Sequence, residues 1–426
     1  MITIKQSEKL KEYRRYFHRF PEPGYLEMKT TIELIKELKA MGFENISYGK
    51  KIHSKRIGLP SEDEIKGHAE GLGKIDADFD VEEILQGYTG LIVDYDTGRS
   101  GPKIGFRFEI DGLKIEETRD ENHLPNKLKF RSENNKCMHA CGHDAHMAIG
   151  LGLADYVKNK KDLKGSFRFI FQPAEEGVHG AKSMVDAGAV DGLDYVFGAH
   201  IGIRVPGGVI GVATDGFLAT EKFDIDLKGR ASHAGILPER GRNALLGAAS
   251  LTLTLHSLPQ HSKGLARVNV GVLRAGSSRN IIAEDAHLEV EIRGESDLIV
   301  KDLKEGLFAA VEGTALAYGL EKKIETVGGS IVFRSKYKDF APGFNKYLED
   351  SGFKTVMNPR LNASEDICYM LNEVEAKGGK ALHFIIGSDL AASHHNGRFD
   401  ISEDSLELGF NMFTKLIDYI YLIEEK

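Results

Sequence analysis

Residues 138–148 read MHACGHDAHMA, and within nine positions they place a thiol, three imidazoles and a carboxylate. Apolar residues with helical spacing follow from Ala148 to Val157, so the polar residues lie on a loop entering a helix, with Asp144 as its expected N-cap. Thiolate and neutral imidazole are preferred ligands of borderline-soft metals. By itself, the pair Cys141 and His143 fits a buried polar turn or a structural zinc knuckle equally well.

Apolar runs on both sides of this stretch predict strands separated by helices. The expected strands cover residues 89–95, 104–111, 166–172, 195–200 and 381–387. Two helices are expected between residues 5 and 41, broken at 20–24, and another closes the chain. Strands that alternate with helices predict an α/β fold, with a mainly parallel sheet and helices on both faces.

The hydrophobic pattern of the sequence changes between residues 215 and 328. Runs at 223–227, 268–272 and 287–292 alternate with period two, as in antiparallel strands covered on one face. Helical stretches near 243–256 and 297–318 separate them. We therefore predict a metal-binding catalytic domain at 1–214 and 329–426, and an inserted α+β lid or dimerisation domain at 215–328.

Four polar residues fall at or just beyond the carboxyl ends of predicted strands, namely Asp111, Glu175, Glu176 and His200, and the pair His394 and His395 follows another strand. Open α/β sheets place their ligand sites at this edge. A random distribution of polar residues would not place so many of them at strand ends. Neighbouring carboxylates on a turn can divide the work, one holding metal and the other acting as general base. Taken singly, these residues also fit a solvated acidic pair, a core histidine and a surface histidine.

The sequence offers five candidate metal ligands, which is more than one tetrahedral ion needs. A bridging thiolate and open positions for water would suit a metal-assisted hydrolase with two ions. The sequence has neither a phosphate-binding glycine loop before the helix nor a Gly-x-Ser-x-Gly elbow. Cys137 is expected to be structural, and His146 either supports the ligands or packs. The five candidate ligands are Cys141, His143, Glu176, His200 and His395.

Composition excludes several classes of function. The chain has 426 residues, a net charge of -8 and no long basic run, which disfavours nucleic-acid and anionic-membrane partners. No apolar run approaches the roughly 20 residues of a membrane span, and no signal peptide is recognisable. Three cysteines are too few for a disulfide framework, so a cytoplasmic location is expected.

Three motifs carry a resemblance to a known family. MHACGHDAH at 138–146, QPAEEG at 172–177 and GRASHAG at 229–235 resemble the M20 metallopeptidase/amidohydrolase family, in its Cys-Gly-His branch. The match runs nearly end to end. Softer matches to the p-aminobenzoyl-glutamate hydrolase A-subunit type are RIGLP at 56–60, TGR at 97–99, RVNVGV at 267–272 and HHN at 394–396.

The resemblance implies two divalent metal ions per subunit, Mn²⁺ or Zn²⁺ with Mn²⁺ favoured. Cys141 would bridge them, and the other four candidate ligands would complete the coordination. Glu175 would be the base, with Asp111 orienting the ligands. The family usually has Asp-x-Asp where this chain has Glu109-Ile110-Asp111, so Glu109 is left outside the predicted site.

For the inserted domain, the resemblance implies contacts with substrate. His233 would reach the partner subunit's active site and polarise the scissile carbonyl, while Asn280 and Arg293 would hold the substrate carboxylate. The predicted function is hydrolysis of an N-acyl amino acid, with an aroyl-glutamate such as p-aminobenzoyl-glutamate favoured, in a homodimer or in a heterodimer with a related subunit. The alternatives are a broader N-acyl-amino-acid or dipeptide hydrolase and a non-catalytic, metal-stabilised binding protein.

Overall fold

The computed structural model describes residues 2–337 and 339–425, which form two compact units. Unit 1 takes the chain up to residue 216, residues 333–361 and the residues from 366 on, and unit 2 takes 217–332 and 362–365. Each unit has its own hydrophobic core. The short return of 362–365 to unit 2, which the sequence did not indicate, follows from backbone pairing: Leu218 N–H donates to the carbonyl of Ala363.

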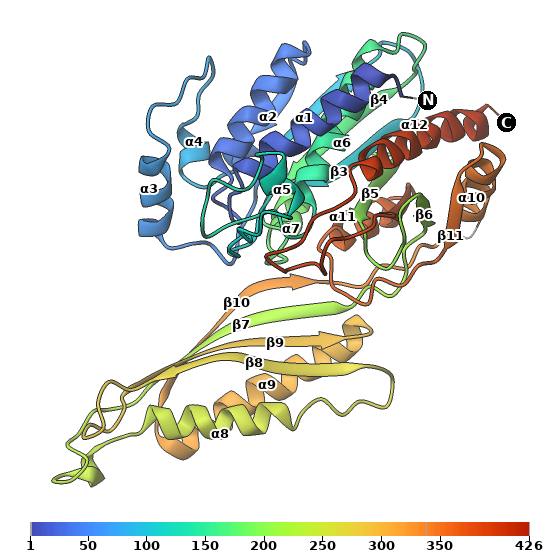
Figure 1. Ribbon diagram of the computed structural model, residues 1–426. Coiled ribbons are helices and arrows are strands. Elements are labelled where there is room, and N and C mark those ends of the chain that lie inside the picture. Colours follow the sequence, from blue (N-terminus) through green and yellow to red (C-terminus); the bar gives the residue numbers. More distant parts are fainter. Residues whose placement is uncertain (1, 338, 426) are drawn as a thin grey trace. The chain divides into compact units, whose positions relative to one another are not determined.

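Unit 1 contains a mixed eight-stranded sheet in the order β1-β2-β4-β3-β5-β12-β6-β11 (Figure 1). The central pairs β4–β3, β3–β5 and β5–β12 are parallel, as is β6–β11, whereas β1–β2, β2–β4 and β12–β6 are antiparallel. The predicted α/β class with a mainly parallel sheet is confirmed. Its strands are β1 (Ile46–Tyr48), β2 (Leu91–Asp96), β3 (Lys103–Glu109), β4 (Ser166–Gln172), β5 (Tyr195–Ile201), β6 (Val209–Val212), β11 (Lys354–Met357) and β12 (Lys380–Ile386).

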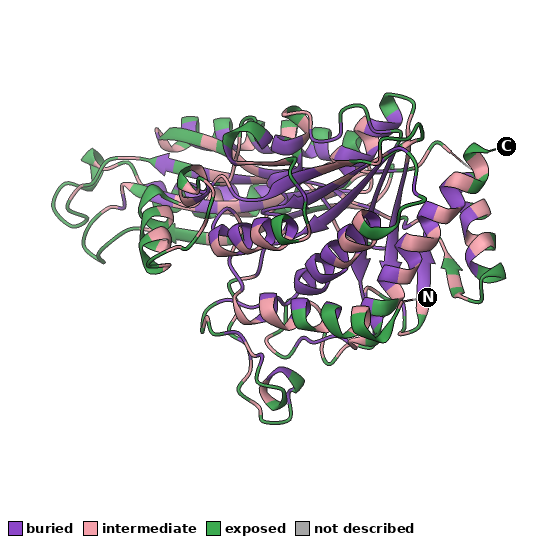
Figure 2. Ribbon diagram, turned by 90° about the horizontal axis from the view of Figure 1, so that it is seen from above, coloured by how far each residue is buried: buried purple, intermediate pink, exposed green. Residues whose placement is uncertain are grey.

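Helices cover both faces of this sheet because its strands are apolar on both sides. In β5, Phe197 packs against Phe340 of α10, while the adjacent Gly198 faces Ile367 at the start of α11. Figure 2 shows the strands buried between helices whose outer faces are exposed. The helices are α1 (Ile4–Arg19), α2 (Met28–Ala40), η1 (Gly49–Ile52), α3 (Glu62–Gly71), α4 (Glu82–Leu85), α5 (Leu124–Lys127), α6 (His143–Asn159), α7 (Gly180–Asp186), α10 (Phe340–Asp350), α11 (Cys368–Ala376) and α12 (Asp404–Glu424).

Unit 2 is an α+β unit with a four-stranded antiparallel sheet in the order β10-β7-β9-β8. Its strands β7 (Ala219–Lys228), β8 (Ala266–Ala275) and β9 (Asp285–Gly294) contain the three predicted runs, and β10 (Glu321–Ser330) was not predicted. Helices α8 (Ala244–His256) and α9 (Asp297–Tyr318) supply apolar residues to the core beneath the sheet, and η2 (Pro238–Arg240) is a short turn.

The start of α6 corrects one prediction. Gly142, in the left-handed region at φ +88°, is the N-cap in place of Asp144, which lies inside the first turn. A side chain at position 142 would meet Ile201, so glycine is required there. The Asp144 carboxylate instead accepts hydrogen bonds from Arg14 and His18 of α1. Among the described helices, none is long and apolar enough to cross a membrane.

Candidate metal centre

The carboxyl ends of four parallel strands and the amino end of α6 bring seven predicted site residues together in unit 1. Asp111 follows β3, the Glu175–Glu176 pair follows β4, and His200 is the penultimate residue of β5. His395 lies on the loop after β12, and its backbone N–H donates to the carbonyl of Ala140, next to Cys141. The central strands share one direction, so residues far apart in sequence meet at one edge.

Thiol, imidazole and carboxylate groups face one another at this edge. Cys141 Sγ lies 3.2 Å from His200 Nε2. His143 Nε2 lies 3.8 Å from a Glu175 oxygen and 4.0 Å from a Glu176 oxygen, and the other Glu176 oxygen is 3.2 Å from His395 Nε2. Cys141, His143, Glu175 and His200 are buried, whereas the His395 side chain is 55% exposed. The centre is therefore buried at Cys141, His143, Glu175 and His200, and open to solvent at His395.

Asp111 connects two parts of the centre. Its Oδ2 accepts a 2.9 Å hydrogen bond from the backbone N–H of Glu176, and His143 Nδ1 lies 3.2 Å from its Oδ1 and 2.9 Å from its backbone oxygen. Burial favours the neutral acid, but the bond with His143 and the backbone N–H groups hold the pKa of Asp111 below its ordinary value. Asp111 thus touches the turn that carries both glutamates.

The hydrogen bonds of two histidines favour the neutral tautomer that a metal requires. Nδ1 of His143 faces the carbonyl of Asp111, and Nδ1 of His200 faces that of Ile201. Carbonyl oxygens only accept, so in the neutral rings Nδ1 carries the proton and Nε2 keeps its lone pair. His143 Nε2 is buried and has no hydrogen-bond partner among the described residues.

The charges of the centre also call for a cation. Burial opposes a charge on His143, but the hydrogen bond with Asp111 and the charges of Asp111 and Glu176 outweigh it and raise the pKa of His143 to about 10. A divalent cation can replace that proton. Burial lowers the pKa of His200 well below its usual range, which keeps this ring neutral. Five groupings of the described residues could hold a metal ion here. Three consist of predicted site residues and His394: Cys141/His200/His394, Cys141/Glu176/His395 and His143/Glu175/Glu176. The other two are Glu109/His143/His146 and Glu175/Glu365/Asp366.

Glu109 and His146 form a buried pair that the sequence analysis did not assign to the site. His146 Nδ1 donates to Glu109 Oε2 at 2.7 Å, and the ring of His146 lies 5.1 Å from that of His200. Arg107 also pairs with Glu109 and donates to Asp366. Burial favours a neutral Glu109, but the charges of Arg107 and His146 hold its pKa well below the ordinary value.

Two spacings could have revealed this pair. His146 follows His143 by three residues, so both lie on one side of α6. Glu109 precedes Asp111 by two residues and shares its side of the strand. His394 was also left out of the predicted ligands. Its ring lies 5.3 Å from that of His200, with Nε2 facing the carbonyl of Ile201 at 3.0 Å.

The loop entering α6 is supported from behind by buried ion pairs. His18 contacts Asp144 at 2.9 Å and Glu117 at 3.0 Å, and Arg14 pairs with Asp144 and Asp400. Burial opposes a charge on His18, but its bonds to the two carboxylates outweigh it and raise its pKa to about 9. A fixed set of charges therefore anchors the first turn of α6.

The other three predicted residues belong to unit 2. His233 is exposed, and its segment pairs with that of Asn280, whose carbonyl accepts from the backbone N–H of Ala234 at 3.0 Å. Arg293 lies near the end of β9, where its Nε is 2.9 Å from Glu291. Asn280 lies before β9, which begins at Asp285. The eight-residue step from Asp285 to Arg293 spans roughly 26 Å of strand. Within one copy of unit 2, Arg293 and the His233–Asn280 pair are far apart.

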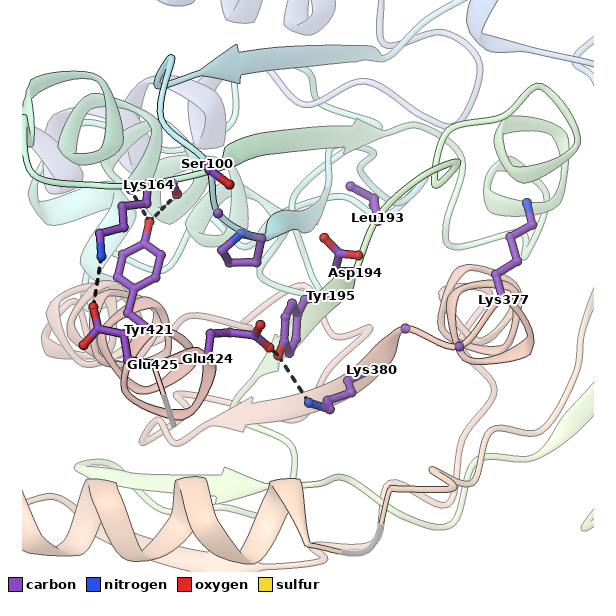
Figure 3. A pocket seen from close by; sticks show the side chains of 14 residues that line it. Ser100, Lys164, Leu193, Asp194, Tyr195, Lys377, Lys380, Tyr421, Glu424 and Glu425 are labelled. Atoms are coloured by element: carbon purple, nitrogen blue, oxygen red, sulfur yellow. Dashed lines mark hydrogen bonds and ion pairs between the residues drawn. The ribbon is translucent and has the colours of Figure 1, made fainter.

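A separate cavity of about 610 Å³ in unit 1 carries different chemistry (Figure 3). Tyr195 and Lys380, the first residues of β5 and β12, line it, so it lies at the edge of the sheet opposite the metal centre. Several of its polar lining residues pair with one another: Lys164 with Glu425, and Tyr195 with Glu424 and Lys380 (Figure 3). This cavity therefore has no part in the metal centre.

Comparisons of the chain with a family model, with known proteins and with solved structures agree with one another. The model of peptidase family M20/M25/M40 matches residues 105–419. One subunit of the p-aminobenzoyl-glutamate hydrolase of Escherichia coli (strain K12) is 40% identical over 414 residues, 96% of this chain and 94% of that protein. The indole-3-acetyl-aspartic acid hydrolase of Enterobacter agglomerans is 37% identical, over 93% and 92%. The crystal structure of the aminobenzoyl-glutamate utilization protein from Klebsiella pneumoniae is similar with a TM-score of 0.81 and 32% identity, over 97% and 95%.

Proposed function

Because the chain belongs to peptidase family M20/M25/M40 and is a hydrolase of amide bonds, we propose that it cleaves p-aminobenzoyl-glutamate to p-aminobenzoate and glutamate. The observation that carries the proposal is the convergence of Cys141, His143 and His200 with Glu175 and Glu176 at one edge of the sheet. An exposed or scattered set of these residues would fit a binding protein equally well.

We propose that Cys141, His143, Glu176, His200 and His395 hold two divalent ions, with Mn²⁺ favoured over Zn²⁺. Such ions, when bound, polarise a carbonyl and make water acidic. Supporting this assignment, the histidines aim Nε2 at the centre, and the buried thiol lies beside one of them. The buried Glu109–His146 pair then supports the ligands from below.

Glu175 is the proposed general base. It is 5% exposed and lies beside His143, whereas Glu176 faces His395. Both carboxylates lie near His143, but only Glu176 also faces His395, which suits one proton carrier and one ligand. Glu175 would take a proton from the attacking water and pass it to the departing amine nitrogen of the amino acid. Asp111 holds the Glu175–Glu176 turn through the backbone N–H of Glu176.

His233 is proposed to act on the active site of a partner subunit, with Asn280 and Arg293 binding the substrate carboxylate from different subunits. Their separation along β9 supports an arrangement across subunits, since one copy of unit 2 cannot bring all three to one small substrate. The partner is a second copy or a related chain, in keeping with the Escherichia coli relative, which is named as one subunit of its hydrolase.

Unit 2 offers a surface for such a partner. Strand β8 is an edge strand among the described residues, and α8 beneath the sheet exposes Leu246 and Leu253, seven residues apart on one side of the helix. An unpaired edge beside exposed leucines suits association with another chain. We place the proposed subunit interface here.

Product analysis tests the proposed reaction. The purified protein, stripped of metal and reloaded with Mn²⁺ or Zn²⁺ separately, is assayed on p-aminobenzoyl-glutamate, p-aminobenzoyl-aspartate, N-acetylglutamate and indole-3-acetyl-aspartate. We expect p-aminobenzoyl-glutamate to have the highest kcat/KM and the chelated protein to be inactive. Equal rates on all four would favour the broader N-acyl-amino-acid hydrolase, which the 37% identity to the indole-3-acetyl-aspartic acid hydrolase supports. No cleavage of any substrate by the metal-loaded homodimer would contradict both.

A further inference from the structure

The turn that carries Glu175 has an unfavourable backbone conformation. Ala174 and Val178, on either side of the two glutamates, both adopt φ +55°, in the left-handed region. Side chains with a Cβ disfavour this region, and a β-branched valine there is a true outlier. Such a conformation persists only when the surrounding structure imposes it.

A buried carboxylate from another part of the chain holds this turn. Glu27, at the N-cap position of α2, is fully buried. Its Oε1 accepts a 2.7 Å hydrogen bond from the backbone N–H of Ala174, and its Oε2 accepts a 2.6 Å bond from the hydroxyl of Thr89. Glu27 therefore links the residue preceding Glu175 to the segment before β2.

The neighbouring glycines show how closely these segments approach the turn. A Cβ on Gly24 would lie 3.0 Å from both Cα and Cβ of Ala174. A Cβ on Gly90, which has φ +84°, would lie 2.5 Å from Pro173. The segments around Gly24 and Gly90 thus pass close to the turn, and Glu27 hydrogen-bonds both to the turn and to Thr89, next to Gly90.

We propose that Glu27 is a positioning residue for the reaction: it holds Ala174 in its left-handed conformation and so fixes where the Glu175 carboxylate stands. The inference rests on the proposed function of Glu175 as the base. Proton transfer needs the base within hydrogen-bond reach of the water. A misplacement of about 1 Å can reduce the rate about 100-fold.

Glu22 is a natural control, because it is another buried carboxylate of the same segment with a different task. Its oxygens accept from the backbone N–H groups of Lys29 and Thr30, which caps α2, and from His68. None of these partners belongs to the turn at 173–179. Loss of Glu22 therefore measures damage to α2 and to its contact with α3, without removing a hydrogen bond to the turn.

The variants separate positioning from packing. Glu27→Leu keeps the volume but removes the acceptor, and we expect kcat to fall about 100-fold, with KM and metal content unchanged. Glu27→Gln should stay near the parent, since its amide oxygen still accepts from Ala174 and its amide N–H₂ can donate to Thr89. Glu22→Leu should reduce thermal stability and leave kcat within about threefold.

Rescue by glycine gives the sharpest readout. Glycine takes φ +55° without steric cost, so adding Ala174→Gly to Glu27→Leu should return about fivefold or more in kcat. A purely structural role for Glu27 predicts no such rescue. If Glu27→Leu does not fold, Glu27→Asp replaces it; one methylene shorter, it should lose kcat in the same direction and be rescued in the same way.

Three results would overturn the positioning role: full kcat in Glu27→Leu, a loss that Ala174→Gly does not relieve, or Glu27→Gln as damaging as Glu27→Leu. Glu175→Gln is measured in parallel. Turnover retained in Glu175→Gln would overturn the proposed function itself. An inactive Glu175→Gln beside a fully active Glu27→Leu would overturn the positioning role alone.

Discussion

The proposed active-site residues of unit 1 and unit 2 are built in opposite ways. In unit 1, His143 and His200 are buried, and hydrogen bonds fix their rings. In unit 2, His233 is exposed on a loop, where its Nδ1 accepts from the nearby backbone N–H of Gly235. Metal ligands must converge before the ion arrives, so they need a rigid framework. A residue that acts on another subunit must stay exposed until the subunits meet.

The largest effect should come from the buried side of this comparison. Cys141→Ser is expected to lose at least one metal ion and more than about 100-fold in turnover, because loss of a supporting partner alone costs about 10- to 100-fold. Cys137→Ser is the matched control, since Cys137 is a second buried cysteine in the same loop. Burial raises the pKa of the Cys137 thiol well above its usual range, so it stays neutral.

Metal analysis after gel filtration, with kcat measured on the same samples, checks this expectation. Cys137→Ser should keep both ions. Equal metal content in the two variants would remove Cys141 from the centre.

On the exposed side, His233→Ala should reduce kcat about 100- to 1,000-fold while metal content is unchanged, as for loss of an oxyanion donor. Mixing His233→Ala with Glu175→Gln then tests the arrangement across subunits. If subunits exchange and His233 acts on its partner, one site in each mixed dimer has both residues, and activity returns. Exchange demonstrated without any return of activity would show that His233 acts within its own chain or not at all.

A smaller effect should separate the support of the centre from its ligands. Glu109→Gln weakens the partner of His146, so we expect metal affinity to fall about 10- to 100-fold, with both ions still bound at saturation. Competition with a chelator measures this affinity. Glu117→Gln is the control, because Glu117 also bonds histidines but contacts none of the proposed ligands. Unchanged affinity in Glu109→Gln would assign the Glu109–His146 pair to packing.

The smallest effect concerns stability and pH. The pKa of His18 is raised from 6.5 to about 9 in the folded protein, so its charge stabilises the fold fully below pH 6.5 and progressively less as pH rises through 9. In metal-free protein, the contribution of His18 to the free energy of unfolding should fall by on the order of 3 kcal/mol over this interval. Urea unfolding of the parent and His18→Gln checks this. Parallel pH profiles for the two proteins would contradict it.

The same comparison explains how far the sequence could be interpreted. Asp111, Glu175 and His200 were identified because strand ends are readable from short-range periodicity, and parallel strands bring their ends together. Strand β10 was missed because it is a charged, glycine-containing edge strand, with little apolar alternation. Its extended conformation depends on its pairing with β7, which its own residues do not indicate.

Long-range partners account for the other differences. Asp144 has the composition of an N-cap, but Arg14 and His18, more than 120 residues earlier, take its carboxylate. Glu109 was set aside as a departure from the Asp-x-Asp pattern, whereas its longer side chain reaches His146. The partners of Asp144 cannot be found from local spacing, because they depend on how α1 packs against α6. The spacings of Glu109 and His146 place each residue on the correct side of its own element, but the pairing of the two depends on how β3 packs against α6.

The central claim is that the buried cluster of unit 1 is a hydrolytic metal centre with Glu175 as its base. The most direct measurement compares the parent with Glu175→Gln for metal content and for turnover of p-aminobenzoyl-glutamate. We predict that Glu175→Gln keeps two ions per subunit while kcat falls by about 100- to 10,000-fold, because removing the base does not remove the ligands. Half of the parent's kcat retained in Glu175→Gln, with its metal in place, would contradict the claim.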